Sequence, residues 1–358
     1  MMQQPSTIEE LQEIVRQSPR VHVRGGGTKS ALSSGAGVSM EKLTGVIEYD
    51  PSEFTFTARG GTPVREVETL LSGSGQYLPF DPVWVDQGAT LGGTIASGLS
   101  GSGRFRYGGV RDFILGLQFV TGDGESHAGG GRVVKNAAGF DFPKLMVGSR
   151  GSMGIITQVT FKVFPRPQRY ATVRVKVTSP LEGSALLQKL ARSSLELACL
   201  DYQPPGEVVM RVGGLASALA RRVERITELV ALPVEVLLDE EEQGVWRAAR
   251  EFSWMPTEDT LLKIPLLAGQ IVSLEAMLSS IGLASTPRRY SVAGNVCWLA
   301  WPADRGPADL VAILSKLDSR AMAIRGKPWG VLGSVRDAEF QKRLAQILDP
   351  AGKLACRY

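Results

Sequence analysis

Histidine and cysteine are scarce in this sequence, and their scarcity excludes several kinds of site. The only histidines are His22 and His127, so the second half of the chain can form neither an imidazole metal site nor a histidine general base. The three cysteines, Cys199, Cys297 and Cys356, are too few and too scattered to ligate an iron–sulfur cluster or build a disulfide framework. We therefore expect no metal site and a reducing compartment.

Long hydrophobic runs and blocks of like charge are also absent. No stretch of 18 apolar residues is present, and the opening MMQQPSTIEE lacks the basic-then-apolar pattern of a secretory signal. The net charge of +4 comes from 40 basic and 36 acidic residues without a basic stripe. These features predict a cytoplasmic protein without nucleic-acid partner or membrane span, with any membrane association made through a complex.

Glycine is abundant, and its distribution divides the chain. Residues 1–167 hold 28 of the 41 glycines, and the remaining residues hold 13. The change falls at VFPRPQRY, residues 163–170, whose two prolines are typical of a linker. Because a single core rarely grows beyond about 250–300 residues, a chain of 358 residues is long enough for two domains. We predict a first domain over 1–167 and a second over 168–330.

Hydrophobic periodicity predicts an α+β fold in both parts. Thr7 and Glu10 form a capping box that begins the first helix. Strands are expected over 21–24, 54–59, 113–120 and 154–164, and a helix over 62–71. The second part reads strand 172–177, helix 181–191, strands 194–202 and 207–212, helix 216–230 and strand 233–238. That βαββαβ order is ferredoxin-like. Further strands are expected at 261–267 and 296–301, and no internal repeat is apparent.

Three glycine-rich loops in the first domain are the candidate ligand site. RGGGTK, residues 24–29, directly follows a strand, and consecutive glycines can point their N–H groups at an anion. The second loop, 88–112, carries eight glycines in its first 22 residues but keeps Leu91, Ile95 and Leu99 at helical spacing, which favours a folded loop over a tether. The third, 133–157, contains Lys135, Asn136 and GSRGSMGII. Three such loops favour a long ligand with a pyrophosphate, although RGGGTK alone would also suit a flexible turn.

Two common nucleotide-binding motifs are absent. The sequence contains no G-x-x-x-x-G-K-[ST], and no G-x-G-x-x-G follows a predicted strand. A P-loop NTPase and a Rossmann dinucleotide fold are therefore disfavoured.

The glycine loops resemble a known family. RGGGTK, FDPVWVDQGATLGGTIASGLSGSGRFRYGGVRD and KNAAGFDFPKLMVGSRGSMGIIT are similar, in that order, to the FAD-binding domain of the vanillyl-alcohol oxidase/p-cresol methylhydroxylase flavoproteins. More narrowly, the third segment resembles the FAD-binding subunits of three-subunit glycolate dehydrogenases. The resemblance implies a two-subdomain FAD-binding domain of the p-cresol methylhydroxylase type followed by a ferredoxin-like α+β cap domain. LDPAGKL resembles the segment by which such chains return to the flavin domain, so 331–358 is expected to do so.

The resemblance also implies which residues contact FAD. Gly25–Lys29 and the loop 88–97 would hold the pyrophosphate, residues 154–156 would contact the adenine or ribose, and the RYG..RD segment would line or brace the pocket. For the last pair of that segment, a purely structural ion pair is an equal alternative. The expected FAD-binding residues are Arg24, Gly25, Gly26, Gly27, Thr28, Lys29, Pro79, Gly88, Ala89, Thr90, Gly92, Gly93, Thr94, Ser97, Arg104, Tyr107, Gly108, Arg111, Asp112, Gly148, Gly154, Ile155 and Ile156.

Departures from the family refine the expected function. Relatives with covalent FAD use a His or Cys near the first loops, whereas this chain has GGGTKS, so FAD should be non-covalent. Relatives that oxidise 2-hydroxy acids resemble one another in a C-terminal histidine cluster, which is missing here. The resemblance therefore implies an FAD-binding subunit of a complex that oxidises glycolate to glyoxylate, with a paralogous catalytic flavin subunit and an iron–sulfur subunit as partners. No catalytic residue is assigned.

Two alternatives stay open. The chain could be a self-sufficient flavin dehydrogenase, with Arg211, Arg247 or Lys263 as a carboxylate ligand in the second domain, or a non-catalytic module shaped by bound FAD. Tryptophans at 252–256 and 296–302 suit either a partner surface or buried packing.

Overall fold

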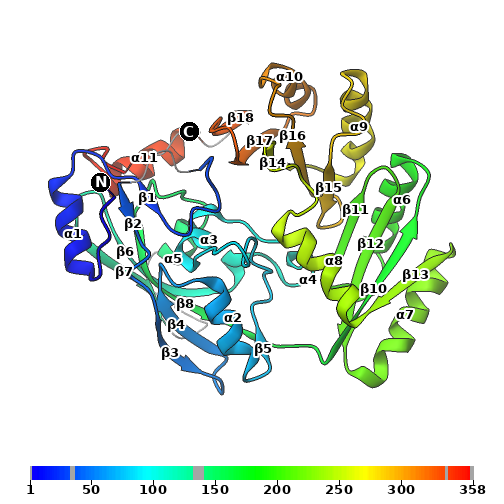
Figure 1. Cartoon of the computed structure of the whole chain (residues 1–358), viewed down its shortest axis with the longest axis horizontal. Coiled ribbons are helices and arrows are strands. Elements are labelled where there is room, and N and C mark those ends of the chain that lie inside the picture. Colours follow the sequence, from blue (N-terminus) through cyan, green and yellow to red (C-terminus); the bar gives the residue numbers. More distant parts are fainter. Residues whose placement is uncertain (1, 33–36, 132–140, 335–337, 355–358) are drawn as a thin grey trace. The chain divides into compact units, whose positions relative to one another are not determined.

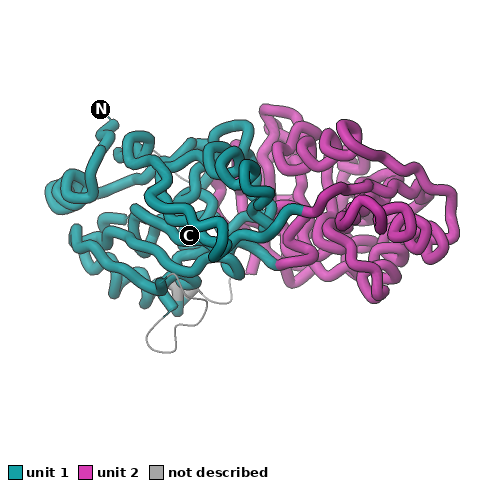
Figure 2. The backbone as a smooth tube through the Cα atoms, turned by 90° about the horizontal axis from the view of Figure 1, so that it is seen from below, with its two compact units in different colours: residues 1–100, 108–166, 336–358 teal, residues 101–107, 167–335 magenta. Residues whose placement is uncertain are grey.

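The computed structural model describes residues 2–32, 37–131, 141–334 and 338–354, which form two compact units. Unit 1 comprises 1–100, 108–166 and 336–358, and unit 2 comprises 101–107 and 167–335 (Figure 2). Unit 2 therefore contains a seven-residue segment, 101–107, from within the second glycine loop. We call it the inserted segment. Lys135 and Asn136 lie outside the described residues.

Unit 1 is built around a five-stranded sheet of order β3-β4-β8-β6-β7 (Figure 1). Its strands are β3 (Val46–Asp50), β4 (Thr55–Arg59), β6 (Ile114–Val120), β7 (Ser126–Gly130) and β8 (Ile155–Lys162). Two small sheets pair β1 (Val23–Arg24) with β2 (Val38–Ser39) and β5 (Gln76–Tyr77) with β9 (Phe164–Pro165). The helices are α1 (Ile8–Gln17), α2 (Val64–Ser72), α3 (Leu91–Ser97), α5 (Phe142–Met146) and α11 (Ala338–Leu348), with a 3₁₀ turn, η1 (Val110–Asp112).

The first helix begins as the sequence predicts, with one difference in its cap. The Glu10 backbone N–H donates to the Thr7 hydroxyl at 3.1 Å. The Glu10 carboxylate, however, accepts from the backbone N–H of Ser6 rather than from that of Thr7. These hydrogen bonds from Ser6 lower the pKa of Glu10. The helix thus has its expected N-terminus, but the return contact reaches one residue further back than a strict capping box.

The C-terminal segment packs against the N-terminal core of unit 1. Leu354 lies in one apolar cluster with Leu11, Val15 and Val21, and the Val21 N–H donates to the Lys353 carbonyl at 2.7 Å. Asp349, which is 5% exposed, accepts from the Leu354 N–H at 2.6 Å. These contacts place the last described residues beside the start of the chain. They also shorten the first strand: Val21 makes an isolated bridge with Leu354, and β1 begins at Val23.

Unit 2 is a nine-stranded antiparallel sheet of order β13-β10-β12-β11-β15-β16-β14-β17-β18 (Figure 1). Its first half contains β10 (Arg169–Lys176), α6 (Pro180–Ala191), β11 (Cys199–Gln203), β12 (Glu207–Gly214), α7 (Ala216–Val230) and β13 (Val234–Leu238). Its second half contains β14 (Thr260–Pro265), η2 (Ala268–Gln270), α9 (Ile271–Ser280), β15 (Arg288–Ser291), β16 (Val296–Trp301), α10 (Ala308–Lys316), β17 (Arg320–Arg325) and β18 (Val331–Gly333). A further helix, α8 (Asp239–Glu251), connects the halves, and the inserted segment forms α4 (Arg104–Tyr107).

The two halves of unit 2 have the same topology. The strand order β13-β10-β12-β11 of the first half matches β17-β14-β16-β15 of the second, and both connect as βαββαβ. They join where Tyr202 of β11 pairs with Tyr290 of β15. The sequence predicts the first half but shows no repeat, because the shared feature is the strand order and not a residue pattern.

The inserted segment and α8 lie on the same face of this sheet. Cys199 and Asp201 are two residues apart on β11, and their side chains therefore point to the same side of the sheet. Cys199 packs with Trp246 of α8, and Asp201 accepts a hydrogen bond from Ser102 of the inserted segment at 2.5 Å. The tryptophans at 298 and 301 are 3% and 0% exposed, so of the two interpretations buried packing describes them.

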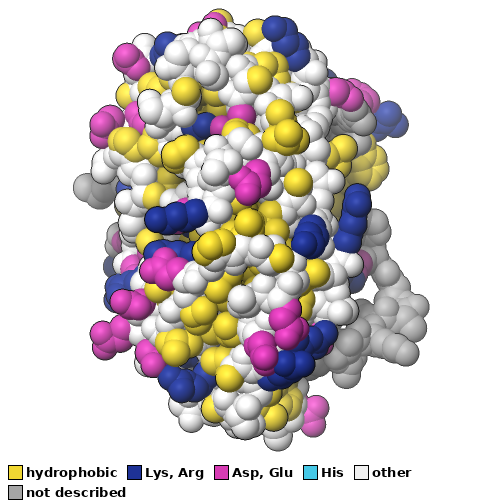
Figure 3. All heavy atoms as spheres, turned by 90° about the vertical axis from the view of Figure 1, so that its right-hand side faces the viewer, with side chains coloured by type: hydrophobic (Ala, Val, Ile, Leu, Met, Phe, Trp, Pro, Cys, Tyr) yellow, Lys and Arg dark blue, Asp and Glu magenta, His cyan; other side chains and the backbone are white. Residues whose placement is uncertain are grey.

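At the edge of the sheet, apolar side chains reach the surface. Val236 and Leu238 of β13 are 41% and 43% exposed. Figure 3 shows hydrophobic side chains among charged ones on the side of the molecule that carries β13, α6 and α7. Among the described residues, no helix is long and apolar enough to cross a membrane.

Candidate functional site

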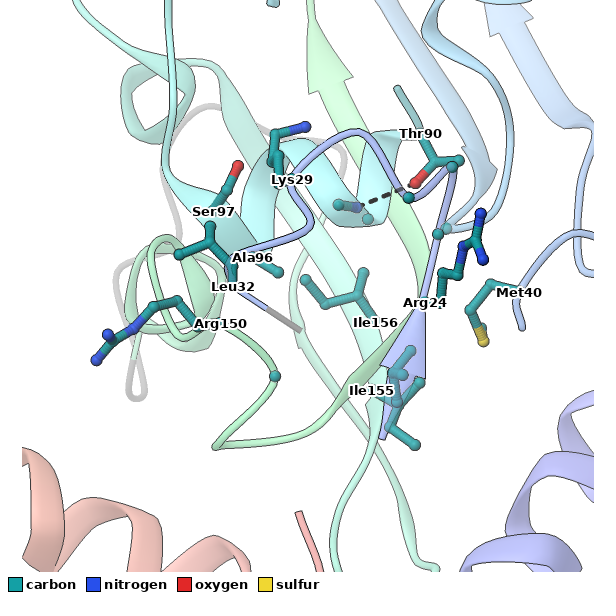
Figure 4. Close-up of a pocket in the computed structure, with 18 of the residues that line it drawn as sticks. Arg24, Lys29, Leu32, Met40, Thr90, Ala96, Ser97, Arg150, Ile155 and Ile156 are labelled. Carbon is teal, nitrogen blue, oxygen red and sulfur yellow. Dashed lines mark hydrogen bonds between the residues drawn. The ribbon is translucent and has the colours of Figure 1, made fainter. Parts of the chain in front are cut away.

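A cleft in unit 1 is lined by residues of all three glycine loops and by the start of β8. It encloses about 780 Å³, a volume that includes space open to solvent. Its lining residues are Val23, Arg24, Gly25, Gly26, Gly27, Thr28, Lys29, Leu32, Met40, Gly60, Thr90, Gly92, Gly93, Ala96, Ser97, Arg150, Gly151, Gly154, Ile155 and Ile156. In Figure 4, Arg24 lies beside Met40, and Lys29, Leu32 and Ser97 lie on the other side.

The glycines of the first loop allow two backbones to touch. A Cβ on Gly26 would lie 1.8 Å from the Gly88 carbonyl oxygen, and one on Gly25 would lie 2.3 Å from the Thr90 hydroxyl. Any side chain here would push the first loop off the second. Gly27 has φ +69°, in the left-handed region that favours glycine. Glycine is therefore required at positions 25 and 26 by the contact between the two loops, and at position 27 by the positive φ of the turn.

The first loop also has backbone N–H groups that are available to bind an anion. Among the described residues, no acceptor is found for the backbone N–H groups of Gly26, Gly27 and Thr28. Successive N–H groups in such a turn form a concave site for phosphate oxygens. On the second loop, the Thr90 hydroxyl accepts from the Gly93 N–H at 3.2 Å and so begins α3 (Figure 4).

Lys29 is the one lysine in the cleft lining, and it is buried. Its side chain is 9% exposed, its Nζ lies 3.2 Å from the Thr28 hydroxyl, and it lies 5.6 Å from the centre of the Trp84 ring. Burial lowers the pKa of Lys29 from 10.5 to about 8, because the ammonium loses its water. No carboxylate among the described residues pairs with it. The cleft thus presents a buried cation and free N–H donors, which together suit a pyrophosphate.

The third loop is held against the second. The Gly148 N–H donates to the Ile95 carbonyl at 2.9 Å, and the Arg150 N–H donates to the Ala96 carbonyl at 2.7 Å. These bonds bring Arg150 and Gly151 to the cleft although neither was among the expected residues. Gly60 and Met40 were missed because they lie outside the three glycine-rich loops: Gly60 is in the turn after β4, and Met40 directly follows β2. A Cβ on Gly60 would lie 2.2 Å from the Ile156 carbonyl oxygen, so the requirement for glycine at this position is the signal that could have identified Gly60.

Thirteen of the expected FAD-binding residues line the cleft, and the structure places ten outside its lining. The thirteen are Arg24, Gly25, Gly26, Gly27, Thr28, Lys29, Thr90, Gly92, Gly93, Ser97, Gly154, Ile155 and Ile156. The ten are Pro79, Gly88, Ala89, Thr94, Arg104, Tyr107, Gly108, Arg111, Asp112 and Gly148.

Several of the ten have contacts elsewhere in the structure. Gly88, Ala89 and Thr94 make hydrogen bonds near their own positions in the second loop: the Gly88 N–H donates to the Val85 carbonyl, the Ala89 N–H to the Trp84 carbonyl, and the Thr94 hydroxyl to the Thr90 carbonyl at 2.9 Å. Pro79 is buried. Gly148 packs against Gly98, where a Cβ would lie 3.2 Å from the Gly148 Cα.

The RYG..RD segment contributes to structure in both units. Arg104 and Tyr107 belong to unit 2. The Asp112 carboxylate accepts from the Gly109 N–H at 2.8 Å, and Gly108, with φ +95°, makes room for it. In the described structure no ion pair joins Arg111 to Asp112, so the ion-pair alternative for these two does not hold.

Known proteins share this architecture. Residues 1–129 match the family model described as FAD binding domain. The glycolate oxidase subunit GlcE of Escherichia coli (strain K12) is 34% identical over 251 residues, which cover 68% of this chain and 67% of that protein. The chain belongs to this family of FAD-binding oxidoreductases. The membership confirms FAD as the cofactor and the predicted oxidoreductase class.

One further relative and one solved structure are also similar to this FAD-binding oxidoreductase. The glycolate oxidase subunit GlcD of Bacillus subtilis (strain 168) is 29% identical over 155 residues, or 42% of this chain and 33% of that protein. A solved structure of alkyldihydroxyacetonephosphate synthase superposes with a TM-score of 0.70 at 15% identity, covering 100% of this chain and 76% of that one. This likeness concerns the fold alone, and it confirms the α+β architecture with a p-cresol methylhydroxylase-type FAD domain.

Proposed function

We propose that this chain is the FAD-holding subunit of a complex that oxidises a small 2-hydroxy acid, glycolate, to the 2-oxo acid glyoxylate. The substrate loses two electrons and two protons, and the electrons leave through a separate iron–sulfur subunit. When bound, FAD supplies the two-electron acceptor that no side chain provides. The cleft of unit 1, with its free N–H donors and buried Lys29, carries the proposal.

We assign a role in FAD binding to several groups of the cleft. The N–H groups of Gly26, Gly27 and Thr28 would hold pyrophosphate oxygens, with Lys29 giving the opposite charge. Ile155 and Ile156 at the start of β8 would contact the adenine or ribose and exclude water from that side. Of the residues that the structure describes, neither a His nor a Cys lines the cleft, which supports non-covalent attachment.

The two proposed partner subunits would supply the histidine and iron–sulfur chemistry for which this chain has few residues. Among the described residues no group of His, Cys, Asp or Glu could hold a metal ion, and no histidine follows His127 in the sequence. We therefore assign proton abstraction from the substrate to a paralogous flavin subunit, for which the similarity to GlcD offers support. The three scattered cysteines support a separate subunit for the iron–sulfur cluster.

The first test is the spectrum of the purified chain, followed by anaerobic addition of glycolate and D-lactate. We expect a bound oxidised flavin that neither acid reduces until the partner subunits are added. Reduction by the chain alone would overturn the division of labour and favour the self-sufficient dehydrogenase. A flavin never reduced, even in the complete complex, would favour the structural module. Failure to bind FAD at any concentration would overturn the whole proposal.

A glycine variant tests the cleft itself. Gly26→Ala would put a methyl group 1.8 Å from the Gly88 carbonyl, so one loop must move and the N–H donors move with it. We expect FAD affinity to fall at least about tenfold, the equivalent of about 1.4 kcal/mol. Gly244→Ala is the matched control, since a Cβ there meets nothing within 4 Å and alanine suits a helix better than glycine. Equal FAD affinity of the two variants would contradict the assignment.

A further inference from the structure

The second glycine loop contributes residues to both units. Gly93 and Ser97 of α3 line the cleft, and Ser97 is the last residue of that helix. Residues 98–101 then lead to Ser102, which lies in the inserted segment and so belongs to unit 2. After the inserted segment the chain returns to unit 1. One continuous stretch of chain therefore connects the lining of the cleft with the packing of unit 2.

The chain between α3 and Ser102 has little freedom to move. Gly98, in the left-handed region with φ +63°, ends the helix, and Leu99 is fully buried. The Ser100 hydroxyl accepts a hydrogen bond from the Val110 N–H at 3.1 Å, which ties together the two ends of the inserted segment. Closely packed residues transmit a displacement to their neighbours. The position of Ser102 therefore constrains the end of α3.

Within unit 2, the buried carboxylate of Asp201 holds Ser102. The two residues are 0% and 5% exposed, and the Ser102 hydroxyl donates to Asp201 at 2.5 Å. The same hydroxyl lies 3.4 Å from that of Ser291. A hydrogen bond to a charged acceptor is among the stronger ones in a protein, and at a buried position water does not readily replace it. The bond is therefore a firm attachment of the inserted segment.

Three further donors fix Asp201 from another part of unit 2. They come from β15 and the residue after it: Arg289 Nε at 2.6 Å, the Ser291 hydroxyl at 3.0 Å and the Val292 N–H at 3.3 Å. Arg289 also supplies the opposite charge. Loss of the Ser102 hydroxyl therefore leaves Asp201 with its charge partner, so a substitution at Ser102 does not create an unpaired buried carboxylate.

A second attachment of the inserted segment is exposed to solvent. Arg106 pairs with Glu196 at 3.2 Å, with side chains that are 27% and 57% exposed. Exposed ion pairs contribute little to stability, because water screens them and both side chains lose freedom. The buried bond from Ser102 to Asp201 is therefore the stronger of these two attachments.

We propose that Ser102 and Asp201 are positioning residues for FAD. Their hydrogen bond holds the second glycine loop in the conformation that binds the cofactor, and the proposal rests on the assignment of the cleft as the FAD site. Without the bond, the loop has this conformation for a smaller fraction of the time, and the apparent affinity for FAD falls by that fraction. Coupling of this kind is reciprocal, so FAD also stabilises the contacts around Asp201 in unit 2.

Two serine variants separate positioning from general stability. Ser102→Ala and Ser291→Ala each remove one hydroxyl from the same buried carboxylate, but only Ser102 lies in the loop that lines the cleft. We expect Ser102→Ala to weaken FAD binding about three- to tenfold, the effect of one hydrogen bond expressed in part. Ser291→Ala should change it less than about twofold, because Arg289 still holds Asp201 in place for Ser102. Calorimetric titration of the FAD-free chains measures both affinities.

Hydrogen exchange tests the reciprocal effect. The Val292 N–H donates to Asp201, so exchange of the backbone over residues 288–296 should become slower when FAD binds the wild-type chain. In Ser102→Ala, FAD should protect these residues less, although it still protects the loops of unit 1. Protection of this segment that is the same in both chains would contradict the coupling.

The outcomes distinguish this proposal from the assignment of the cleft. Equal FAD affinity of wild type and Ser102→Ala, while Gly26→Ala still weakens binding, would overturn the positioning role and leave the cleft assignment intact. An equal loss of affinity in Ser102→Ala and Ser291→Ala would also overturn it, because the carboxylate would then act through the stability of unit 2 alone. A wild-type chain that binds no FAD would overturn both.

Discussion

We predict that Lys29 makes FAD binding depend on pH. In the cleft without cofactor its pKa is about 8, so it is about nine-tenths protonated at pH 7 and about one-tenth at pH 9. A pyrophosphate beside the ammonium favours the charged form and returns the pKa toward 10.5 or above. FAD binding between these values must therefore take up a proton. If only the charged lysine contributes, affinity falls about tenfold from pH 7 to pH 9, because each unit above the free pKa costs a factor of about ten.

Lys29→Met removes this dependence and reveals its size. At pH 7 we expect FAD affinity to fall about 10- to 100-fold, as for the loss of one charge-assisted hydrogen bond. The variant should then bind FAD equally at pH 7 and pH 9. The FAD-free variant should be at least as stable as the wild type, because an unpaired buried lysine is replaced by an apolar chain of similar length.

Calorimetry measures both quantities. Titration of FAD at pH 8 in two buffers of different ionisation enthalpy gives the proton uptake, expected at about half a proton per FAD. Lys42→Met, at an exposed lysine of unit 1, should retain the wild-type pH dependence. Uptake of no proton, or a pH dependence that persists in Lys29→Met, would refute the placement of Lys29 beside the pyrophosphate.

Two stability predictions test the units separately. Glu275→Ala leaves Arg288 buried without its carboxylate, so we expect a loss of about 3–5 kcal/mol in the unfolding of unit 2, measured by denaturant titration, with FAD content retained. An unchanged transition would contradict the pairing. Asp349→Ala removes the acceptor of the Leu354 N–H, and we expect about 1–3 kcal/mol less stability for unit 1 by thermal unfolding. If its melting temperature stays the same, the C-terminal segment does not support the core as described.

Local signals in the sequence predict much of unit 1 and the first half of unit 2. Glycines mark the loops because only glycine allows the backbone contacts and positive φ values found at Gly26 and Gly27. The helix Ala216–Val230 and the strand Val296–Trp301 agree with the structure to the residue, since each has a clear period and clear ends. The strand expected from 194 begins only at Cys199, because a turn occupies the intervening residues.

The missed elements have weaker local signals. Helix α8 directly follows β13, and its first turn consists of Asp239 and three glutamates. The first turn therefore contributes no apolar residue to the helical pattern. Helices α9 and α10 belong to the second ferredoxin-like half, which shares the strand order of the first but not its sequence. A repeat of strand order without a repeat of sequence cannot be detected from the residues alone.

The glycine loops of the sequence by themselves predicted a ligand with a pyrophosphate, because a phosphate site depends on backbone conformation and glycine indicates that conformation locally; the resemblance of these loops to known flavoproteins then implied FAD. Only the tertiary structure decided which charged side chains are buried and which of them meet. Burial in the cleft lining lowers the pKa of Lys29, and Arg289 donates to Asp201, 88 residues earlier, because the strand order of unit 2 brings β15 beside β11. Burial and register are properties of contacts between distant residues, and no local pattern specifies them.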